Sequence, residues 1–329
     1  MTAIRYQDRT YDCAPGETVL DCLTAGGVTV PSSCRAGVCQ SCLMRAEEGE
    51  VPAAAQAGLK PTLAAQGYFL ACSCRPQTPL TVALPDAERL RMAAEVVSIE
   101  PLNADIVAVK LKPSQQLAYR AGQFIRLYKD DDQSRCYSLA SVPELDDHLE
   151  IHVRAVPGGQ VSGWVHRELR AGDAVEIADS SGLCFYVDDR PQQPLLLLGT
   201  GSGLAPLYGI LRDALNQGHR GPVWLYHGST TPQGLYRTRE LAALAERHPH
   251  FHYVRCVSEG EVPEGFRPGT PLDAALADHP VLDGWRVFLC GHPELVRKGR
   301  MEAFLAGASM ADIHADPFVP SGGGLAAAA

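Results

Sequence analysis

The chain has 329 residues, more than a single hydrophobic core usually fills, so two or three domains are expected. Apolar residues make up 46% and charged residues 20%, a globular composition, and the longest aliphatic run, Leu195 to Leu198, is far too short to cross a bilayer. The net charge of −9 disfavours nucleic acid and anionic membrane as partners, because both attract basic surfaces.

Cysteine usage and the start of the chain both predict a cytoplasmic protein. The first residues, Met1-Thr2-Ala3-Ile4-Arg5, contain no apolar stretch of the kind that signal peptides carry. The cysteines number 11, an odd count, and in a reducing compartment metal ligation explains them better than disulfides do. Metal chemistry is expected near the N-terminus, where most of them lie: Cys13, Cys22, Cys34, Cys39, Cys42, Cys72 and Cys74.

The first motif is a group of three cysteines, Cys34, Cys39 and Cys42, spaced C-x4-C-x2-C. This spacing is typical of plant-type 2Fe-2S proteins, in which a fourth thiolate comes from elsewhere in the chain. Gly37 can take the dihedral angles that a tight loop around a cluster demands. A zinc loop or three reduced core cysteines are the alternatives, but zinc ribbons usually offer two separated C-x-x-C pairs.

Short strands and one helix are expected around this motif. Strands are predicted at residues 4–6, 10–13 and 43–46, and apolar residues at helical spacing predict a helix over residues 17–26. Cys22 on that helix is expected to be a core thiol. Elements in this order are typical of a small half-barrel with one helix.

With the run Gly67-Tyr68-Phe69-Leu70-Ala71-Cys72, this stretch resembles plant-type ferredoxins, which implies a β-grasp ferredoxin domain over residues 1–88. In that family about thirty residues separate the third and fourth ligands, and a proline follows four positions later. Cys72 and Pro76 fit this pattern, whereas Cys74 breaks it. Cys74 lies two residues along the same expected strand and should point to its opposite face. The resemblance therefore implies four cluster ligands: Cys34, Cys39, Cys42 and Cys72.

A charged segment, residues 86–91, is predicted to be a linker to a second module of β-strands. Strands at 95–99, 106–111, 124–128 and 149–153 suggest an antiparallel barrel. Within it, Arg135 and Tyr137 are two residues apart on an expected strand, so their side chains share one face and can reach the same flat ligand. The guanidinium suits a pyrophosphate, and the tyrosine ring suits stacking on an aromatic ring system. Ser138 can offer its hydroxyl to a ring nitrogen. An exposed strand with a surface arginine is the alternative.

Two flanking segments, residues 121–124 and the glycine turn at 157–164, join this run in resembling the flavin domain of the ferredoxin–NADP reductase superfamily. The resemblance implies an FAD-binding β-barrel over residues 92–190, with FAD favoured over FMN. Arg135 and Ser162 would hold the FAD phosphates, while Tyr137 and Ser138 would meet the isoalloxazine. The implied flavin-binding residues are Arg135, Tyr137, Ser138, Ile151, His152, Val153, Arg154, Gly159, Val161 and Ser162.

The third module begins with an apolar strand at 195–198 that runs into a glycine-rich turn, residues 199–206, which can cradle a phosphate. The turn is not the G-x-G-x-x-G fingerprint, because Gly203 comes too early and Pro206 occupies the slot of the third glycine. Later strands at 223–228, 251–254 and 287–291 alternate with helices. This alternation predicts a doubly wound parallel sheet with its ligand at the carboxyl ends of the strands.

The glycine turn and the later C-G-x-P run resemble the nicotinamide dinucleotide pocket of the same superfamily, which implies an NAD(P)-binding domain over residues 191–320. Ser138 and Cys290 are the implied catalytic residues. Phe318 is a candidate aromatic near the flavin, with a core anchor as the alternative. The implied nucleotide-binding residues are Gly199, Thr200, Gly201, Ser202, Gly203, Cys290, Gly291 and Pro293.

The choice between NADH and NADPH depends on the segment after the second strand of this module. No acidic residue stands in residues 227–236, and Gly234 occupies the position where related dioxygenase reductases often have an aspartate. Arg237 and Arg239 lie close by and are candidates for binding a 2′-phosphate. NADH is favoured on family grounds.

Taken together, the three modules resemble the single-chain NAD(P)H reductase components of bacterial oxygenases, such as naphthalene and benzoate dioxygenase reductases. That resemblance implies hydride transfer from NAD(P)H to FAD, then single-electron transfer through the 2Fe-2S cluster to an oxygenase or its ferredoxin. An acceptor such as a deoxysugar-forming dehydratase, or a redox sensor without turnover, is the alternative. The low-complexity segment 321–329 is left out of the expected fold.

Overall fold

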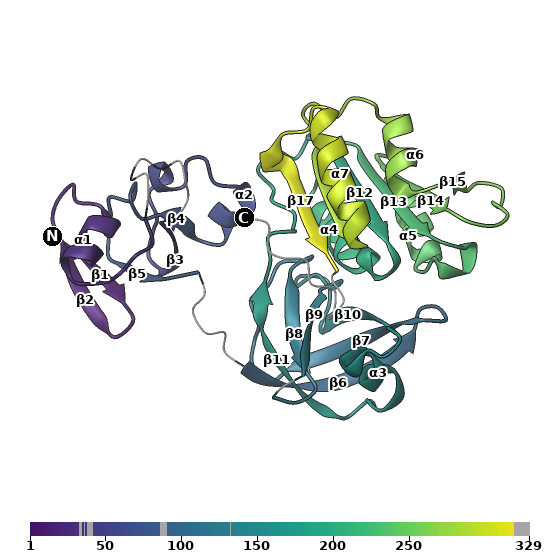
Figure 1. Ribbon diagram of the computed structural model, residues 1–329, viewed down its shortest axis with the longest axis horizontal. Coiled ribbons are helices and arrows are strands. Elements are labelled where there is room, and N and C mark those ends of the chain that lie inside the picture. The colour runs from purple at the N-terminus through teal and green to yellow at the C-terminus, as the bar shows by residue number, and fades with distance from the viewer. Residues whose placement is uncertain (33–34, 36, 38–41, 86–90, 132, 319–329) are drawn as a thin grey trace. The chain divides into compact units, whose positions relative to one another are not determined.

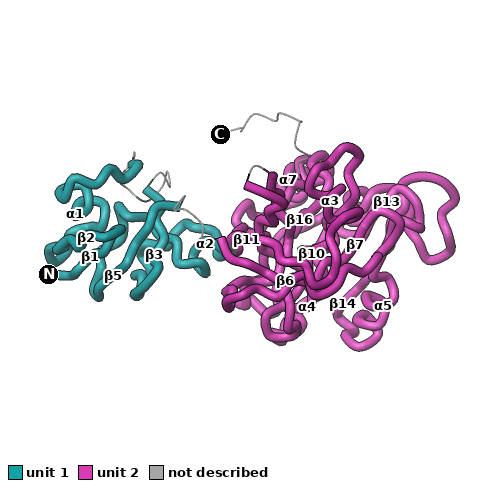
Figure 2. Tube along the Cα trace, turned by 90° about the horizontal axis from the view of Figure 1, so that it is seen from below, with its two compact units in different colours: residues 1–89 teal, residues 90–329 magenta. Residues whose placement is uncertain are grey.

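The computed structural model describes residues 1–32, 35, 37, 42–85, 91–131 and 133–318. The chain divides into two compact units, Met1–Arg89 and Leu90–Ala329 (Figure 2). Among the helices of the described ranges, none is long and apolar enough to cross a membrane.

The first unit is a five-stranded sheet covered by a short helix (Figure 1). Its elements are β1 (Thr2–Tyr6), β2 (Arg9–Cys13), α1 (Val19–Ala25), β3 (Leu43–Glu48), the 3-10 turn η1 (Ala53–Ala55), α2 (Pro61–Ala65), β4 (Tyr68–Leu70) and β5 (Leu80–Ala83). The strand order is β2-β1-β5-β3-β4, in which β1 and β5 are parallel and the other neighbours antiparallel. The Thr18 hydroxyl starts α1 by accepting a hydrogen bond from the Asp21 amide at 3.1 Å. The predicted half-barrel with one principal helix is confirmed.

The second unit begins with an antiparallel barrel. Its elements are β6 (Arg91–Pro101), β7 (Ile106–Pro113), β8 (Phe124–Tyr128), β9 (Ser134–Ser138), β10 (Leu149–Arg154), α3 (Gln160–Arg167) and β11 (Ala174–Ser181). The strand order is β10-β7-β6-β11-β8-β9, and all neighbours are antiparallel. A bridge between Leu139 and Ile151 brings the two outermost strands together and closes the barrel. The predicted antiparallel barrel is confirmed.

The rest of the second unit is a six-stranded parallel sheet. Its elements are β12 (Leu195–Thr200), η2 (Gly201–Gly203), α4 (Leu204–Asn216), β13 (Val223–Ser229), η3 (Pro232–Gly234), α5 (Thr238–Arg247), β14 (Phe251–Val257), β15 (Arg267–Pro268), α6 (Pro271–Asp278), β16 (Arg286–Gly291), α7 (Pro293–Leu305), η4 (Met310–Asp312) and β17 (Ile313–Pro317). The strand order is β15-β14-β13-β12-β16-β17. Chain progression reverses at β12, so the predicted doubly wound sheet is confirmed.

Helices cover both faces of this sheet, as the aliphatic run in β12 requires (Figure 1). Leu195 and Leu197 pack in the core formed with α4 and α5, whereas Leu196 and Leu198 pack in the core formed with α6 and α7. All four side chains are buried. The helices cover the faces of the sheet but not the carboxyl ends of its strands, which is where the candidate nucleotide site lies.

Candidate functional site

Two of the four predicted cluster ligands lie together in the first unit. Cys42 immediately precedes β3 and Cys72 follows β4, and the Ala71 amide donates to the Cys42 carbonyl at 3.0 Å. Burial raises the pKa of the Cys42 thiol, and the adjacent Cys72 thiol contributes to its electrostatic surroundings. The backbone thus places Cys42 next to Ala71 and Cys72, where both cysteines are available to one metal centre. Cys34 and Cys39 lie outside the described residues.

Cys74 does not lie where its predicted strand would put it. The expectation that Cys72 and Cys74 occupy opposite faces of one strand is wrong. Residues two apart on a strand would share a face, and these two are not on a strand. Strand β4 ends at Leu70, and the amides of Ser73 and Cys74 both donate to the Leu70 carbonyl, forming a turn. The turn directs Cys74 into the core, where burial raises the pKa of its thiol to about 12. Its carbonyl accepts from the Val19 amide at 2.9 Å, at the start of α1.

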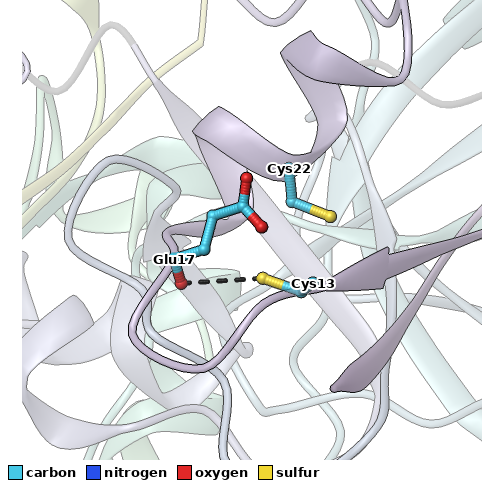
Figure 3. Close-up of side chains that lie close together, drawn as sticks. All are labelled: Cys13, Glu17 and Cys22. Carbon is cyan, nitrogen blue, oxygen red and sulfur yellow. Dashed lines mark hydrogen bonds between the residues drawn. The ribbon is translucent and has the colours of Figure 1, made fainter.

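The remaining thiols of this unit form a separate group. Cys13, Glu17 and Cys22 each offer an atom within 4.8 Å of the others, and Figure 3 shows the three side chains around α1. The Cys13 thiol donates to the Glu17 carbonyl at 3.6 Å, and burial raises the pKa of Cys13 to about 12. Cys22 belongs to the hydrophobic core, so its predicted role as a core thiol is confirmed.

Replacing Cys72 or Cys74 with alanine separates a ligand from a core thiol. We expect Cys72→Ala to lose the iron, the acid-labile sulfide and the visible absorbance of a 2Fe-2S cluster, because Cys72 lies beside Cys42 and is the proposed fourth ligand. We expect Cys74→Ala to keep all three and to lower only the stability. Iron and sulfide analysis of the purified variants makes the comparison, and the reverse result would make Cys74 the fourth ligand.

The predicted flavin residues come from three neighbouring segments of the barrel. Arg135 and Tyr137 lie on β9, and the Leu139–Ile151 bridge sets the end of that strand beside β10. Burial raises the pKa of the Tyr137 hydroxyl to about 12, so the ring is neutral and can stack. Ser162 lies in the first turn of α3, and its hydroxyl accepts from the Val156 amide at 3.3 Å.

The side chains of β10 are less available to a ligand than the sequence implied. Ile151 and Val153 point into the barrel core, so they can offer a ligand only their main chains. The His152 side chain is buried against Tyr236, with 3.0 Å between Nδ1 and the Tyr236 hydroxyl. Arg154 is the exposed side chain of the four, and it pairs with Asp105 at 2.9 Å.

A cavity of about 1650 Å³ opens at the carboxyl ends of the parallel strands, beside β12 where the strand order reverses. This is the position at which doubly wound proteins bind nucleotides. Its walls come from barrel residues 104–106, 154 and 156, the turn after β12, the segment after β13, the end of β16 and most of α7. The lining residues include Thr200, Gly201, Ser202, Ser229, Thr230, Gly291, Pro293 and Phe318.

Close backbone packing explains the glycines of this cavity. A Cβ atom on Gly203 would lie 2.5 Å from the carbonyl oxygen of Cys290, and one on Gly291 would lie 2.6 Å from the carbonyl oxygen of Thr200. Gly201 has a φ of +54°, which favours glycine. The turn after β12 and the end of β16 are thus locked together, leaving backbone groups to face a phosphate.

Ser138 and Cys290, the two predicted catalytic residues, converge with a carboxylate that the sequence did not single out. The Ser138 hydroxyl donates to Asp316 Oδ2 at 2.7 Å, and Asp316 pairs in register with Cys290 across β16 and β17. Burial raises the pKa of Asp316. Cys290 itself is fully buried, with its sulfur 3.6 Å from that of Cys184, and it does not line the cavity. Phe318 is held nearby by its amide, which donates to the Gly291 carbonyl at 2.8 Å.

The arginines suggested for a 2′-phosphate do not line the cavity. Arg237 pairs with Glu150 at 2.7 Å and with Glu240 at 3.0 Å, so its guanidinium is already committed. Arg239 is exposed and outside the cavity wall. The wall after β13 consists of uncharged residues, namely Ser229, Thr230, Thr231, Gln233 and Gly234.

Comparison with known proteins gives three consecutive domain matches. Residues 3–77 match the 2Fe-2S iron-sulfur cluster binding domain, residues 93–186 the oxidoreductase FAD-binding domain, and residues 197–300 the oxidoreductase NAD-binding domain. Two curated relatives each align over 97% of this chain. The reductase subunit of an aromatic O-demethylase from Amycolatopsis sp. is 36% identical, and the alignment covers 99% of that protein. The reductase component of the naphthalene 1,2-dioxygenase system from Pseudomonas putida is 30% identical, and the alignment covers 98% of that protein.

The solved structures give the same assignment. The crystal structure of the Amycolatopsis cytochrome P450 reductase GcoB matches with a TM-score of 0.68 and 35% identity, covering 97% of this chain and 99% of that one. A ferredoxin reductase in carbazole 1,9a-dioxygenase matches the fold with a TM-score of 0.65 and 23% identity, covering 97% and 98%.

Proposed function

Because the chain belongs to the family of ferredoxin–NAD(P) reductase components of oxygenase systems, we propose that it carries electrons from NAD(P)H through FAD and a 2Fe-2S cluster to a partner oxygenase. The observation that supports this most directly is that Ser138 of the barrel contacts Asp316 of β17, whose chain neighbours Ala315 and Pro317 line the nucleotide cavity. The protein acts in the cytoplasm under this proposal. The proposed domains are residues 1–88, 92–190 and 191–320.

The residues present suit the three cofactors. The neighbouring thiols of Cys42 and Cys72 suit iron, and the glycines at 201 and 203 leave backbone room for a pyrophosphate. When bound, FAD accepts a hydride and releases electrons singly, which is the conversion that joins a nicotinamide to an iron–sulfur cluster. Arg135, Tyr137 and Ser162 are the proposed flavin contacts, beside the main chain of 151–154. The other proposed contacts are Gly159 and Val161 for the flavin, and Gly199, Thr200, Ser202, Gly291, Pro293 and Phe318 near the nucleotide.

We propose that the Ser138 hydroxyl accepts a hydrogen bond from the flavin ring. Its proton is directed to Asp316 at 2.7 Å, so the lone pairs of its oxygen are left for another donor. Asp316 thereby fixes the orientation of the hydroxyl. It also lies beside the Cys290 backbone, at the edge that a nicotinamide would approach.

The proposed function is tested by following NADH oxidation by the purified holoprotein, after heat release and chromatographic identification of its flavin. We expect continuous, many-fold turnover with ferricyanide, and NADH-dependent electron delivery to an aromatic-ring oxygenase component. Consumption of about one NADH per flavin, with no further turnover, would instead favour a redox sensor.

Asp316→Ala is expected to slow flavin reduction by NADH about tenfold, because the Ser138 hydroxyl loses the acceptor that orients it. Asp316→Asn, which keeps an acceptor oxygen, should slow it less. Stopped-flow absorbance of the flavin at saturating NADH measures both rates. Equal rates in both variants and the unchanged protein would show that Asp316 does not orient Ser138.

NADH is the proposed nucleotide, and we expect its kcat/KM to exceed that of NADPH by more than about tenfold. The cavity wall after β13 carries no cation, and the guanidinium of Arg237 is held by Glu150 and Glu240. Steady-state kinetics with both nucleotides at equal ionic strength decide the matter. A preference for NADPH would mean that the 2′-phosphate is met by a cation of the cavity lining, which includes Arg154, Arg297, Lys298 and Arg300, or by Arg237 or Arg239 after reorientation.

A further inference from the structure

The loop between β13 and α5 is fastened to the barrel at two points. The Asn103 side-chain amide donates to the Gly234 carbonyl at 2.8 Å. Two residues further on, Tyr236 and Arg237 contact β10: the Tyr236 hydroxyl lies 3.0 Å from His152 Nδ1, and Arg237 lies 2.7 Å from Glu150. The barrel therefore holds a loop that belongs to the nucleotide-binding sheet.

The contacts to β10 form one directed chain of hydrogen bonds. Burial lowers the pKa of His152, so its imidazole is neutral and has one donor and one acceptor nitrogen. Nε2 lies 2.9 Å from Glu150, which can only accept, so Nε2 carries the proton and Nδ1 accepts from Tyr236. Arg237 donates to the same Glu150 oxygen. Arg237 Nε is buried without a hydrogen-bond partner in the part of the chain that the structure describes, so the contact is fixed by the two bonds that Glu150 accepts and by the His152–Tyr236 bond.

The other half of the loop forms a wall of the nucleotide cavity. Ser229, Thr230, Thr231, Gln233 and Gly234 line it, and they follow the second strand of the doubly wound sheet. In this fold the segment after the second strand meets the ribose of the adenosine half of a dinucleotide. This segment lines the cavity, and the residues that follow it, Tyr236 and Arg237, attach it to β10.

We propose that Glu150 and His152 are positioning residues for the dinucleotide: through Arg237 and Tyr236 they hold the adenosine wall of the cavity in its binding-competent position. This inference rests on the proposed function, because it assigns the wall to NADH. Both residues act on nucleotide affinity, since Ser138 and Asp316, to which hydride transfer is assigned, belong to other elements and are not among the residues that line the cavity. Because this segment is already ordered before the nucleotide binds, less conformational entropy is lost on binding and the affinity is higher.

The chain offers a matched control pair. Arg212 of α4 makes a bidentate ion pair with Asp146, both distances being 2.8 Å, and this pair also joins the barrel to the parallel sheet. It is partly buried, as the Glu150–Arg237 pair is. Neither of its residues lines the cavity or belongs to the loop. Asp146→Asn therefore removes a comparable contact without touching the wall.

The test compares Glu150→Gln, Tyr236→Phe and Asp146→Asn as FAD-loaded holoproteins. We expect Glu150→Gln to raise the KM for NADH and the Kd for NAD+ about tenfold, which corresponds to about 1.4 kcal/mol, with limiting flavin reduction within about twofold of the unchanged protein. Tyr236→Phe, which removes one hydroxyl and keeps the ring, should give a smaller increase in the same direction. Asp146→Asn should lower the melting temperature and leave both constants unchanged.

Unchanged nucleotide affinity in both Glu150→Gln and Tyr236→Phe would overturn the proposal, as would an equal loss of affinity in Asp146→Asn. If Glu150→Gln does not hold FAD, the result for Tyr236→Phe decides. The Kd for NAD+ is measured by calorimetry and needs no turnover. A protein that binds NAD+ with these differences but does not oxidise NADH would contradict the proposed function and support the positioning role.

Discussion

Cys42→Ala is expected to lower the rate of electron delivery to an oxygenase component more than about hundredfold. Its rate of NADH oxidation with ferricyanide should stay within about twofold of that of the unchanged protein. Cys42 lies beside Cys72 and is one of the four proposed ligands, so its loss leaves an incomplete ligand set for the cluster. Ferricyanide can take electrons from the flavin directly, and the flavin residues belong to the other compact unit. Parallel assays with the two acceptors, normalised to FAD content, give the ratio.

Cys22→Ala is the control for this experiment. Its thiol is buried in the same core as that of Cys42, but it lies on α1 in the group with Cys13 and Glu17. We expect both activities to persist in this variant. If Cys42→Ala instead lost both activities while keeping its flavin and its fold, the order of electron transfer proposed above would be wrong.

Arg286→Met is expected to destabilise the second unit by about 3 to 5 kcal/mol, because it removes the cation from a buried network. Arg286 is 1% exposed, and its guanidinium reaches Asp189 at 2.7 Å, the Val187 carbonyl at 2.8 Å and Asp312 at 3.4 Å. These contacts tie the start of β16 to the segment that leaves the barrel. Urea unfolding followed by tryptophan fluorescence reports on this unit, since all three tryptophans, Trp164, Trp224 and Trp285, belong to it.

An exposed pair provides the comparison for Arg286. Lys110→Met breaks an ion pair with Glu100 on the barrel surface and should lower the free energy of unfolding by no more than about 1 kcal/mol.

The loss of stability in Arg286→Met should also depend on pH. Burial alone would raise the pKa of Asp312, but Arg190 and Arg286 outweigh it and lower that pKa. The stabilisation is therefore present above the ordinary carboxyl pKa and is lost below about pH 4, where the variant and the unchanged protein should converge. A pH-independent difference would mean that Asp312 is not involved.

Local patterns in the sequence were sufficient for the fold and for most of the site. The aliphatic run at 195–198 is buried on both faces, as its composition predicts, and the alternating strands of the second module form the barrel. The glycine turn lies at the cavity as predicted, because its alternate glycines allow a close approach of main chain, such as that of Gly203 to the Cys290 carbonyl. In each case the information lies within a few consecutive residues.

The errors and omissions concern contacts between distant parts of the chain. Cys74 was assigned to a strand because nothing in Ala71-Cys72-Ser73-Cys74 reveals that two amides share the Leu70 carbonyl. Asp316 was overlooked because its partner, Ser138, is 178 positions away. Arg237 resembled a phosphate ligand because the sequence gives its distance from β13 but not its pairing with Glu150.

The strand order carries a consequence for synthesis of the protein. Strand β17 is the last element that the structure describes, yet it supplies Asp316 and pairs with β16 over five residues. A ribosome delivers these residues only after the barrel, the glycine turn and the other parallel strands have been made. Until then β16 has an unpaired edge, and the Ser138 hydroxyl lacks its acceptor. A nascent chain can therefore complete the Ser138–Asp316 contact and cover the edge of β16 only after β17 has been made.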